Sequence, residues 1–497
     1  MEKSKEKNLL KNSGITLIAL VIIVIVLLIL AGVTVATLTG DNSLLTKAGE
    51  TKLETEKAAI RETIQTESAG LESERQLKSK TDREVFETLQ VRLNLEEAQY
   101  QISSKSMTIT TREGYMFTVL YDGTVKDGKF ACLDIADGNI DFYSNGYKQY
   151  KGNNNNNTTL YAGDYIIIGT TTENVVRVCD VGTYNIIVRD LNINVEGKSP
   201  ITCNANRYPN DVEVNITLNG NNYLTTTSGP CLSFDIAYTT EEITNRSTIT
   251  FNGEGSLTAN VIGNQLGSVI GGSYGGPGTY NNCNANLIIN SGTFNIGASH
   301  NGASIGSGLR GSGFFITING GKIYAKGGEY GGAIGGRDGD GKVTINGGYI
   351  QTSGNSVIGY RWKEVEINGG TIDTGRVSCK TGGNIKISGG NILSKNNGIS
   401  TYEGSTLVTY NLTNETTSIY ETKIKLKDVE ENKKITKLVT SDNIEYGIKD
   451  MSTFEDGMLY LYLPEGSRTI TIEADGKTYS GVVNTTVEGT ITELTAI

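Results

Sequence analysis

Residues 316–325 read ITINGGKIYA, and this string returns in related form along the middle of the chain. Its copies are LIINSGTFNI at 287–296, VTINGGYIQT at 343–352, VEINGGTIDT at 365–374 and IKISGGNILS at 385–394. The five copies begin 29, 27, 22 and 20 residues apart, and less regular ones begin at Val214 and Ser247. Self-similarity at periods of this length indicates a repeat architecture.

Each copy describes a strand, a bend and a second strand. Apolar and polar residues alternate before the bend, as in Ile316 and Ile318, which is typical of a strand with one buried face. The Asn-Gly-Gly string supplies residues that accept the positive φ of a sharp bend. A third strand ends in Ile-Gly, with its isoleucine at Ile270, Ile305, Ile334 and Ile358.

A single repeat of this kind cannot bury its apolar face, so the copies must stack as coils. The pattern predicts a mainly β protein whose residues 130–405 form a parallel β-helix. Its winding should be right-handed, because crossover connections between parallel strands are right-handed. The expected core ladders are Leu287, Ile316, Val343, Val365, Ile385; Ile289, Ile318, Ile345, Ile367, Ile387; and Phe294, Ile323, Ile350, Ile372, Ile392. Asn290, Asn319, Asn346 and Asn368 should stack at the bend, where Ser388 ends the row. The fixed turn string disfavours the alternative, a β-sandwich.

Composition agrees with a folded chain that turns often. There are 62 Gly but only 5 Pro, and 37% of the residues are hydrophobic. Collagen and disordered glycine-rich chains do not combine these features. The net charge of −10 argues against nucleic acid as a partner. The single histidine, His300, lies in no zinc or serine-triad motif.

The N-terminus carries a long apolar run from Ile15 to Leu38, preceded by Lys3, Lys5, Lys7 and Lys11. These 24 residues would form a helix of about 36 Å, enough to cross a bilayer core of about 30 Å. The lysines predict that the N-terminus lies on the cytoplasmic side, so the bulk of the chain should be extracellular. The expected localisation is therefore the cell membrane through one helix, and a plain signal anchor is the simpler interpretation.

The string NSGITLIAL at 12–20 resembles the processing site of type IV prepilins, where a lysine-rich leader ends in glycine before a long apolar helix. The resemblance implies cleavage by prepilin peptidase between Gly14 and Ile15, and contact with other pilins in the membrane. Ala19 stands where pilins usually carry glutamate, which favours a minor pilin or a pilin-like anchor over a major pilin.

The remaining segments divide by composition into a leader (1–14), a transmembrane helix (15–40), a charged helical stalk (41–100) with a break near Gly70, and a small β region (101–129). After the solenoid (130–405), residues 406–497 read as a small C-terminal β-sandwich, or alternatively as a cap on the open end of the solenoid. Cys179, Cys203, Cys231 and Cys283 are spaced so that they could stack on adjacent coils, either as reduced buried thiols or as a disulfide.

The repeat pattern also resembles right-handed β-helix proteins that act on or bind polysaccharides, such as pectate lyases and carbohydrate-binding surface modules, and glycine-rich I-N-G-G repeat surface proteins of Gram-positive bacteria. A lyase would need clustered carboxylates that hold calcium, and a base. Asp338 and Asp340 are the closest match to such a metal site, although an exposed turn is the simpler interpretation. No catalytic group is identified, so the sequence favours a protein that is not an enzyme and needs no cofactor.

Exposed aromatic residues near the third-strand turn are the candidate glycan-binding residues, because aromatic faces pack against sugar rings. They are Tyr274, Tyr330, Tyr360 and Trp362, and the alternation after Ile358 predicts that Tyr360 and Trp362 both point outward. Ordinary surface aromatics are the simpler interpretation. The leading hypothesis is a membrane-tethered adhesin that binds polysaccharide or host glycan. A structural minor pilin and a polysaccharide lyase or hydrolase are the alternatives.

Overall fold

The computed structural model describes residues 44–152, 158–161, 163–203, 212–234, 247–263, 265–273, 281–336, 341–394, 399–400, 406–409, 419–444, 446–487 and 489–497. These residues fall into two compact units, one that ends at Gly128 and one that begins at Lys129. The expected leader and the apolar run at 15–38 lie outside the described residues. Within the part that is described, no helix is long and apolar enough to cross a membrane.

The first unit combines three helices with a four-stranded antiparallel sheet in the order β1-β2-β3-β4. The helices are α2 (Leu44–Ser68), α3 (Leu71–Lys78) and α4 (Asp82–Leu93). The strands are β1 (Gln99–Ile102), β2 (Ser106–Thr110), β3 (Met116–Leu120) and β4 (Val125–Asp127). Gly70 is the N-cap of α3, so the break expected there is confirmed.

The apolar residues that the sequence assigned to a stalk form a core of this first unit. Val85, Phe86 and Leu89 of α4 are buried against Ile109 and Phe117 of the sheet. Thr81 begins α4 with a capping box, in which its hydroxyl and the carboxylate of Glu84 satisfy each other's backbone N–H groups. The amphipathic pattern therefore serves a packed α+β unit and not an isolated helix.

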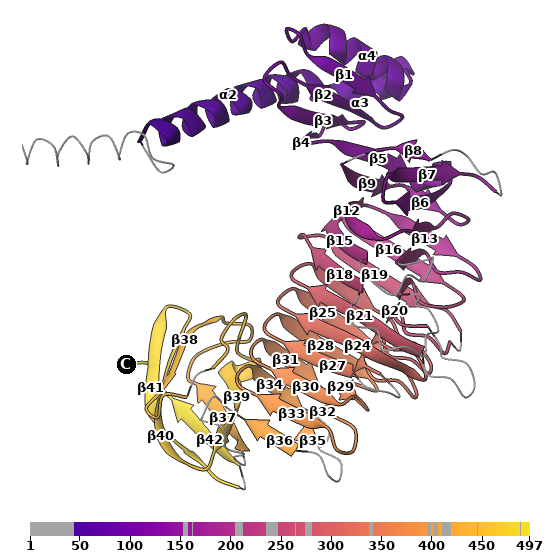
Figure 1. The fold of residues 1–497 in the computed structure, drawn as a ribbon. Helices are drawn as coiled ribbons and strands as arrows, with labels where there is room; N and C mark the ends of the chain where they lie inside the picture. The colour runs from indigo at the N-terminus through magenta and orange to yellow at the C-terminus, as the bar shows by residue number, and fades with distance from the viewer. Residues whose placement is uncertain are drawn as a thin grey trace, which may run out of the picture. The chain divides into compact units, whose positions relative to one another are not determined.

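The second unit is dominated by parallel strands stacked in three long sheets, an arrangement consistent with a β-helix (Figure 1). Sheet I contains β5 (Phe130–Asp134), β9 (Asp164–Ile168), β12 (Gly182–Arg189), β15 (Val212–Asn219), β18 (Ser247–Asn252), β21 (Asn281–Ile289), β24 (Gly311–Ile318), β27 (Gly341–Ile345), β30 (Glu364–Ile367), β33 (Asn384–Ile387) and β36 (Thr406–Thr409). The strand β36 lies in the region that the sequence assigned to the C-terminal domain, and here it pairs with β33 as a further coil.

Sheets II and III complete each coil. Sheet II contains β10 (Thr170–Thr171), β13 (Asn192–Val195), β16 (Asn221–Thr226), β19 (Ser256–Val261), β22 (Thr293–Ile296), β25 (Lys322–Gly327), β28 (Tyr349–Gly354), β31 (Thr371–Thr374) and β34 (Asn391–Ser394). Sheet III contains β6 (Asn139–Tyr143), β7 (Gly146–Tyr150), β8 (Thr159–Leu160), β11 (Val176–Val178), β14 (Ile201–Cys203), β17 (Leu232–Phe234), β20 (Ile270–Gly271), β23 (Ile305–Gly306), β26 (Ile334–Gly335), β29 (Val357–Tyr360), β32 (Arg376–Ser378) and β35 (Ile399–Ser400). Among the described strands of these sheets only β6 with β7 and β7 with β8 pair antiparallel, so the alternative of a β-sandwich is wrong for the described coils.

The core ladders expected from the sequence are confirmed by strand register. Leu287 pairs with Ile316, and the row continues through Val343, Val365 and Ile385. The row from Phe294 through Ile323 to Ile392 is in register as well. All members of the three rows are buried, so each coil contributes the same three apolar layers to one continuous core. The expected right-handed winding of these coils stays a prediction.

The asparagine row at the bend is also confirmed. Each side-chain amide donates to the amide oxygen of the preceding coil, at 2.8 Å for Asn319 to Asn290, 2.8 Å for Asn346 to Asn319 and 2.9 Å for Asn368 to Asn346. Ser388 closes the row by donating to Asn368 at 2.6 Å. Every interior member both donates and accepts, so the ladder satisfies polar groups that stacking would otherwise leave unpaired.

The two glycines of each bend have different tasks. The second, such as Gly348 with φ of +92°, takes the positive φ that the sequence predicts for the bend. The first, such as Gly347, has no positive φ, but a Cβ there would lie 2.6 Å from the carbonyl oxygen of Asn319 on the preceding coil. The first glycine is therefore required by the close stacking of coils.

The C-terminal region from Ile419 forms two three-stranded sheets. One has the order β39-β37-β42, with β37 (Ile419–Leu426), β39 (Met458–Pro464) and β42 (Thr490–Leu494). The other has the order β38-β40-β41, with β38 (Ile435–Thr440), β40 (Gly466–Ala474) and β41 (Lys477–Thr485). Short 3₁₀ turns lie at Ile135–Asp137 in the first coil and Glu455–Gly457 in this region.

This C-terminal region packs against the bends of the last coils. The Asp450 carboxylate accepts a hydrogen bond from the Gly348 N–H at 3.1 Å, and the Ser452 N–H donates to the Thr371 hydroxyl at 2.7 Å. The Tyr460 N–H donates to the Asn391 amide oxygen at 2.8 Å. The contacts fall along the side of the coils at their bends, so the region is fixed to the bend column of the solenoid.

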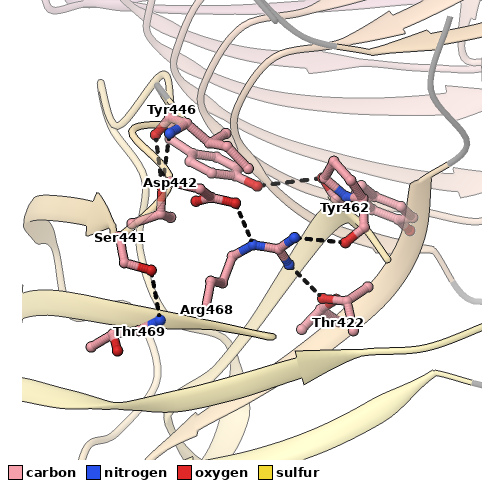
Figure 2. Close-up of polar contacts among 11 residues, drawn as sticks. Thr422, Ser441, Asp442, Tyr446, Tyr462, Arg468 and Thr469 are labelled. Atoms are coloured by element: carbon pink, nitrogen blue, oxygen red, sulfur yellow. Dashed lines mark hydrogen bonds and ion pairs between the residues drawn. The ribbon is translucent and has the colours of Figure 1, made fainter. Parts of the chain in front are cut away.

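A buried arginine connects the strands of this region. Figure 2 shows Arg468 of β40 donating to Asp442 at 2.8 Å. Its other nitrogens donate to the Pro464 carbonyl at 2.9 Å and to the Thr485 hydroxyl at 3.0 Å, and Thr485 in turn contacts Thr422 of β37. The Arg468 side chain is only 4% exposed, so these bonds take the place of its hydration.

We expect acid to weaken this network. Burial raises the pKa of Asp442, but the hydrogen bond from Arg468 and its positive charge lower it by more. The pKa of Asp442 is therefore below its usual value. A folded pKa below the unfolded one means that the stabilisation is complete above about pH 4 and is lost as the pH falls through the folded pKa. Thermal unfolding of the full chain between pH 7 and pH 3 measures this. The Asp442→Asn variant should show a smaller loss of Tm on acidification, and an equal loss in both proteins would contradict the prediction.

The cysteines do not stack at equivalent positions. Cys203 lies opposite Phe234 on the next coil, whereas Cys231 precedes the residue that pairs with Ile201. Cys203 and Cys231 are buried free thiols, and Cys132, Cys179 and Cys379 are buried as well. Burial raises the pKa of Cys203 to about 12, which keeps that thiol protonated and unreactive. The side chain of Cys283 lies outside the described residues.

Candidate functional site

The residues selected from the sequence are only partly described by the structure. Gly14, Ile15, Tyr274, Asp338 and Asp340 lie outside the described residues, so their roles in processing, glycan binding and metal binding stay predictions. Within the described ranges there is no group of three or more His, Cys, Asp or Glu residues placed to hold a metal ion.

Two of the predicted aromatic residues reach the surface. Tyr330 lies in the turn after β25, is 45% exposed, and has its ring edge-on to His300 with the centroids 5.3 Å apart. Tyr360 ends β29 and is half-buried, with the guanidinium of Arg361 5.6 Å from its ring centroid. Both tyrosines therefore present part of a ring to solvent.

The prediction that Trp362 points outward is wrong. Its side chain is 0% exposed, its indole nitrogen donates to the Ser307 hydroxyl at 3.3 Å, and its ring packs on Phe314. The strict alternation behind the prediction fails because Gly359 and Arg361 both have positive φ, and β29 carries a register shift against β26. The chain therefore turns the indole into the core of the solenoid.

The structure places a hollow on the outer face of sheet II instead. This sheet-II groove has a volume of about 570 Å³ and crosses β19, β22, β25 and β28. Its outward side chains are polar or aromatic: Thr258, Asn260, Asn295, Tyr324, Lys326, Gln351 and Ser353. It runs along the solenoid axis, because its members come from successive coils at equivalent positions.

Register explains how these side chains come together. Thr258, Asn295, Tyr324 and Gln351 are direct partners on neighbouring parallel strands, and a second row joins Lys326 to Ser353. The rows alternate with buried positions such as Ile323, so the outward side chains lie about 4.8 Å apart along the axis. Gly297 leaves room beside Asn260, because a Cβ there would lie 2.5 Å from the amide oxygen of Asn260.

Tyr324 is the aromatic residue of this groove, and Tyr349 packs beside it without lining the groove. Tyr324 is 36% exposed, and its ring centroid lies 6.0 Å from that of Tyr349 on the next coil. Burial and the charge of Asp373 raise the pKa of Tyr349, so its hydroxyl stays protonated. Gln351 donates to Asp373 at 3.0 Å, which fixes the amide at the end of the groove.

Sequence reasoning missed this groove although one signal for it exists. Asn295, Tyr324, Gln351 and Asp373 occupy the same position in the aligned copies, one residue after the apolar residue that follows the bend. Reading down that column would have shown a row of polar and aromatic side chains.

Comparisons with known proteins assign this chain to no family. No protein-family model matches the chain, and neither a curated protein nor a solved structure matches it. The interpretation of the groove therefore rests on its own geometry and chemistry.

Proposed function

We propose that this protein is a membrane-tethered, pilin-like surface protein whose solenoid binds an extended carbohydrate chain along the sheet-II groove. The observation that supports the proposal most strongly is the row of outward polar side chains interrupted by the ring of Tyr324, which packs beside the ring of Tyr349. Aromatic faces pack against the apolar faces of sugars, and amide and hydroxyl groups exchange hydrogen bonds with sugar hydroxyls.

The repeat of the groove also suits a polymer. Coils rise by about 4.8 Å each, which is close to the length of one sugar unit in an extended chain. A ligand that lies along the axis would meet one outward side chain of the row Thr258, Asn295, Tyr324 and Gln351 at each unit. A polysaccharide or host glycan fits this periodicity better than a compact small molecule.

The tether rests on the N-terminal string. We propose that prepilin peptidase cleaves between Gly14 and Ile15 and that the apolar run from Ile15 holds the protein in the membrane, with or without entry into a pilus. Mass measurement of the N-terminus of protein purified from its native membrane tests the cleavage. A mature chain that begins at Ile15 is expected, and one that begins at Met1 would remove the pilin-like part of the proposal.

Glycan binding is expected to depend on Tyr324. Replacing it by alanine removes a ring that a sugar would cover, so we expect about a 10-fold loss of affinity, or about 1.4 kcal/mol. A glycan array run with the full chain identifies the ligand, and titration with that glycan gives the affinity.

Tyr330→Ala is the matched control, because Tyr330 is an exposed tyrosine that does not line the groove. It should change the affinity by less than about twofold. An equal loss in both variants would place binding elsewhere, and no binding to any polysaccharide would favour the purely structural minor pilin.

A further inference from the structure

A second hollow lies at the first coils of the solenoid, far along the sequence from the sheet-II groove. This tyrosine pocket has a volume of about 460 Å³. It is lined chiefly by aromatic rings, one aliphatic side chain and one cation: Tyr143, Tyr161, Tyr165, Tyr184, Leu160 and Lys129. Leu160 is 76% exposed, so its apolar side chain is accessible to a ligand.

The rings form one packed cluster. The centroid of Tyr161 lies 5.3 Å from that of Tyr165, and Tyr165 lies 4.5 Å from the buried Phe142. Tyr147 lies edge-on to both Tyr161 and Tyr165. The cluster packs on the core of the solenoid, which holds these rings in place beside the pocket.

The tyrosine hydroxyls of the pocket are oriented by backbone acceptors. Tyr161 donates to the carbonyl of Asp164 at 3.2 Å, and Tyr184 donates to the carbonyl of Asp180 at 3.0 Å. Burial raises the pKa of Tyr143 and that of Tyr165 to about 12, so these groups stay neutral. The hydroxyl oxygens of Tyr161 and Tyr184 keep lone pairs that accept from a ligand hydroxyl.

Lys129 supplies the charge of the pocket. Its ammonium lies 4.7 Å from the ring centroid of Tyr161, and among the described residues it has no ion-pair partner. No carboxylate side chain lines the pocket in the part of the chain that is described. A cation held over an aromatic wall without a counter-ion is complementary to an anionic group on a ligand that also has an apolar face.

We propose that the tyrosine pocket binds a pyranose that carries a carboxylate, as in a uronic or sialic acid unit. The sugar ring packs on Tyr161, its hydroxyls donate to the tyrosine oxygens, and its carboxylate pairs with Lys129. The site is separate from the sheet-II groove and does not depend on it. It selects for charge, whereas the groove presents mainly neutral polar groups.

Isothermal titration of the full chain with glucuronate, glucose and acetate tests the charge and the ring separately. Glucuronate should bind about 10-fold more tightly than glucose, because only it makes the charge-assisted contact. It should also bind more tightly than acetate, which lacks a ring. In Lys129→Gln the preference for glucuronate over glucose should disappear while glucose binding is retained.

Matched variants separate this site from a general effect of charge. Lys148→Gln removes a lysine that also lies over a pocket tyrosine, Tyr143, but does not line the pocket, and it should leave glucuronate binding within about twofold. Tyr161→Phe keeps the ring and should retain most of the affinity, whereas Tyr161→Ala should lose it. Equal losses in Lys129→Gln and Lys148→Gln, or equal affinities for glucuronate and glucose, would overturn the proposal.

The groove variant distinguishes the two sites. Tyr324→Ala should leave the binding of glucuronate unchanged, since Tyr324 lies on sheet II and does not line the tyrosine pocket. If Tyr324→Ala abolished glucuronate binding and Lys129→Gln did not, the acidic sugar would belong to the groove and the pocket proposal would fail. If the groove binds no polysaccharide, glucuronate is still expected to bind in the tyrosine pocket, because the two sites share no residues.

Discussion

An alanine at Gly306 is expected to lower the free energy of unfolding of the solenoid by about 4 kcal/mol. Gly306 has φ of +137°, and a Cβ there would lie 1.8 Å from the carbonyl oxygen of Gly335 on the next coil. Overpacking of this kind costs about 1–3 kcal/mol, and a non-glycine residue in such a conformation costs about 1–3 kcal/mol more. The clash is with backbone, so no rotamer change relieves it.

The same contact recurs one coil earlier. A Cβ at Gly271 would lie 1.9 Å from the Gly306 carbonyl oxygen, so the Ile-Gly ends of the third strand form a row in which close stacking requires glycine. The fluorescence of the one tryptophan, Trp362, reports unfolding of the solenoid in urea. Gly382→Ala is the control, because Gly382 also has positive φ but nothing within 4 Å, so only about 1–2 kcal/mol should be lost. Similar losses in the two variants would show that stacking distance is not the cause.

The ladders were predictable because local pattern and long-range register carry the same information. Alternation in Ile316 and Ile318 fixes which face is buried, and the Asn-Gly-Gly string fixes where the chain bends. Once both recur in each copy, parallel stacking brings equivalent residues into contact without further information. The asparagine row follows in the same way, since Asn319 and Asn346 occupy one position relative to the bend.

The first unit was only partly predictable. The spacing of Val85 and Leu89 indicates an amphipathic helix, but an apolar stripe does not say what covers it. The structure shows the sheet of β1 to β4 as the partner, whereas composition indicates only a charged helical stalk followed by a small β region. The pairing depends on contacts between α4 and strands that follow it in the sequence, which no local pattern encodes.

The sheet-II groove was missed for a different physical reason. Outward positions such as Asn260 and Lys326 are not constrained by burial, so their residue types vary from coil to coil and give a weaker signal than the apolar ladders. The hollow also depends on a missing side chain at Gly297, which matters only because Asn260 lies beside it on the preceding coil. Because the repeat length varies between coils, the sequence does not show directly that Gly297 and Asn260 become neighbours.

Trp362 is expected to be the most sensitive single side chain of the core. It is the largest fully buried residue, so Trp362→Ala removes an indole from a closed environment and should cost about 4 kcal/mol in unfolding free energy. It also leaves the Ser307 hydroxyl without the donor that now bonds to it at 3.3 Å. Circular dichroism in urea measures the loss, since the variant has no tryptophan.

A double-mutant cycle with Gly341 tests why the indole fits. A Cβ at Gly341 would lie 2.5 Å from the Trp362 ring and 2.8 Å from the Phe314 carbonyl oxygen, so Gly341→Ala alone should be destabilising by about 2 kcal/mol. In the Trp362→Ala background the first clash is gone, and only the carbonyl contact remains. The double variant should therefore lose less stability than the sum of the two single losses, by at least about 1 kcal/mol. Strict additivity would mean that Gly341 is required only by the carbonyl of Phe314. In that case the indole of Trp362, which the sequence pattern places at the surface, would not need the space that glycine leaves.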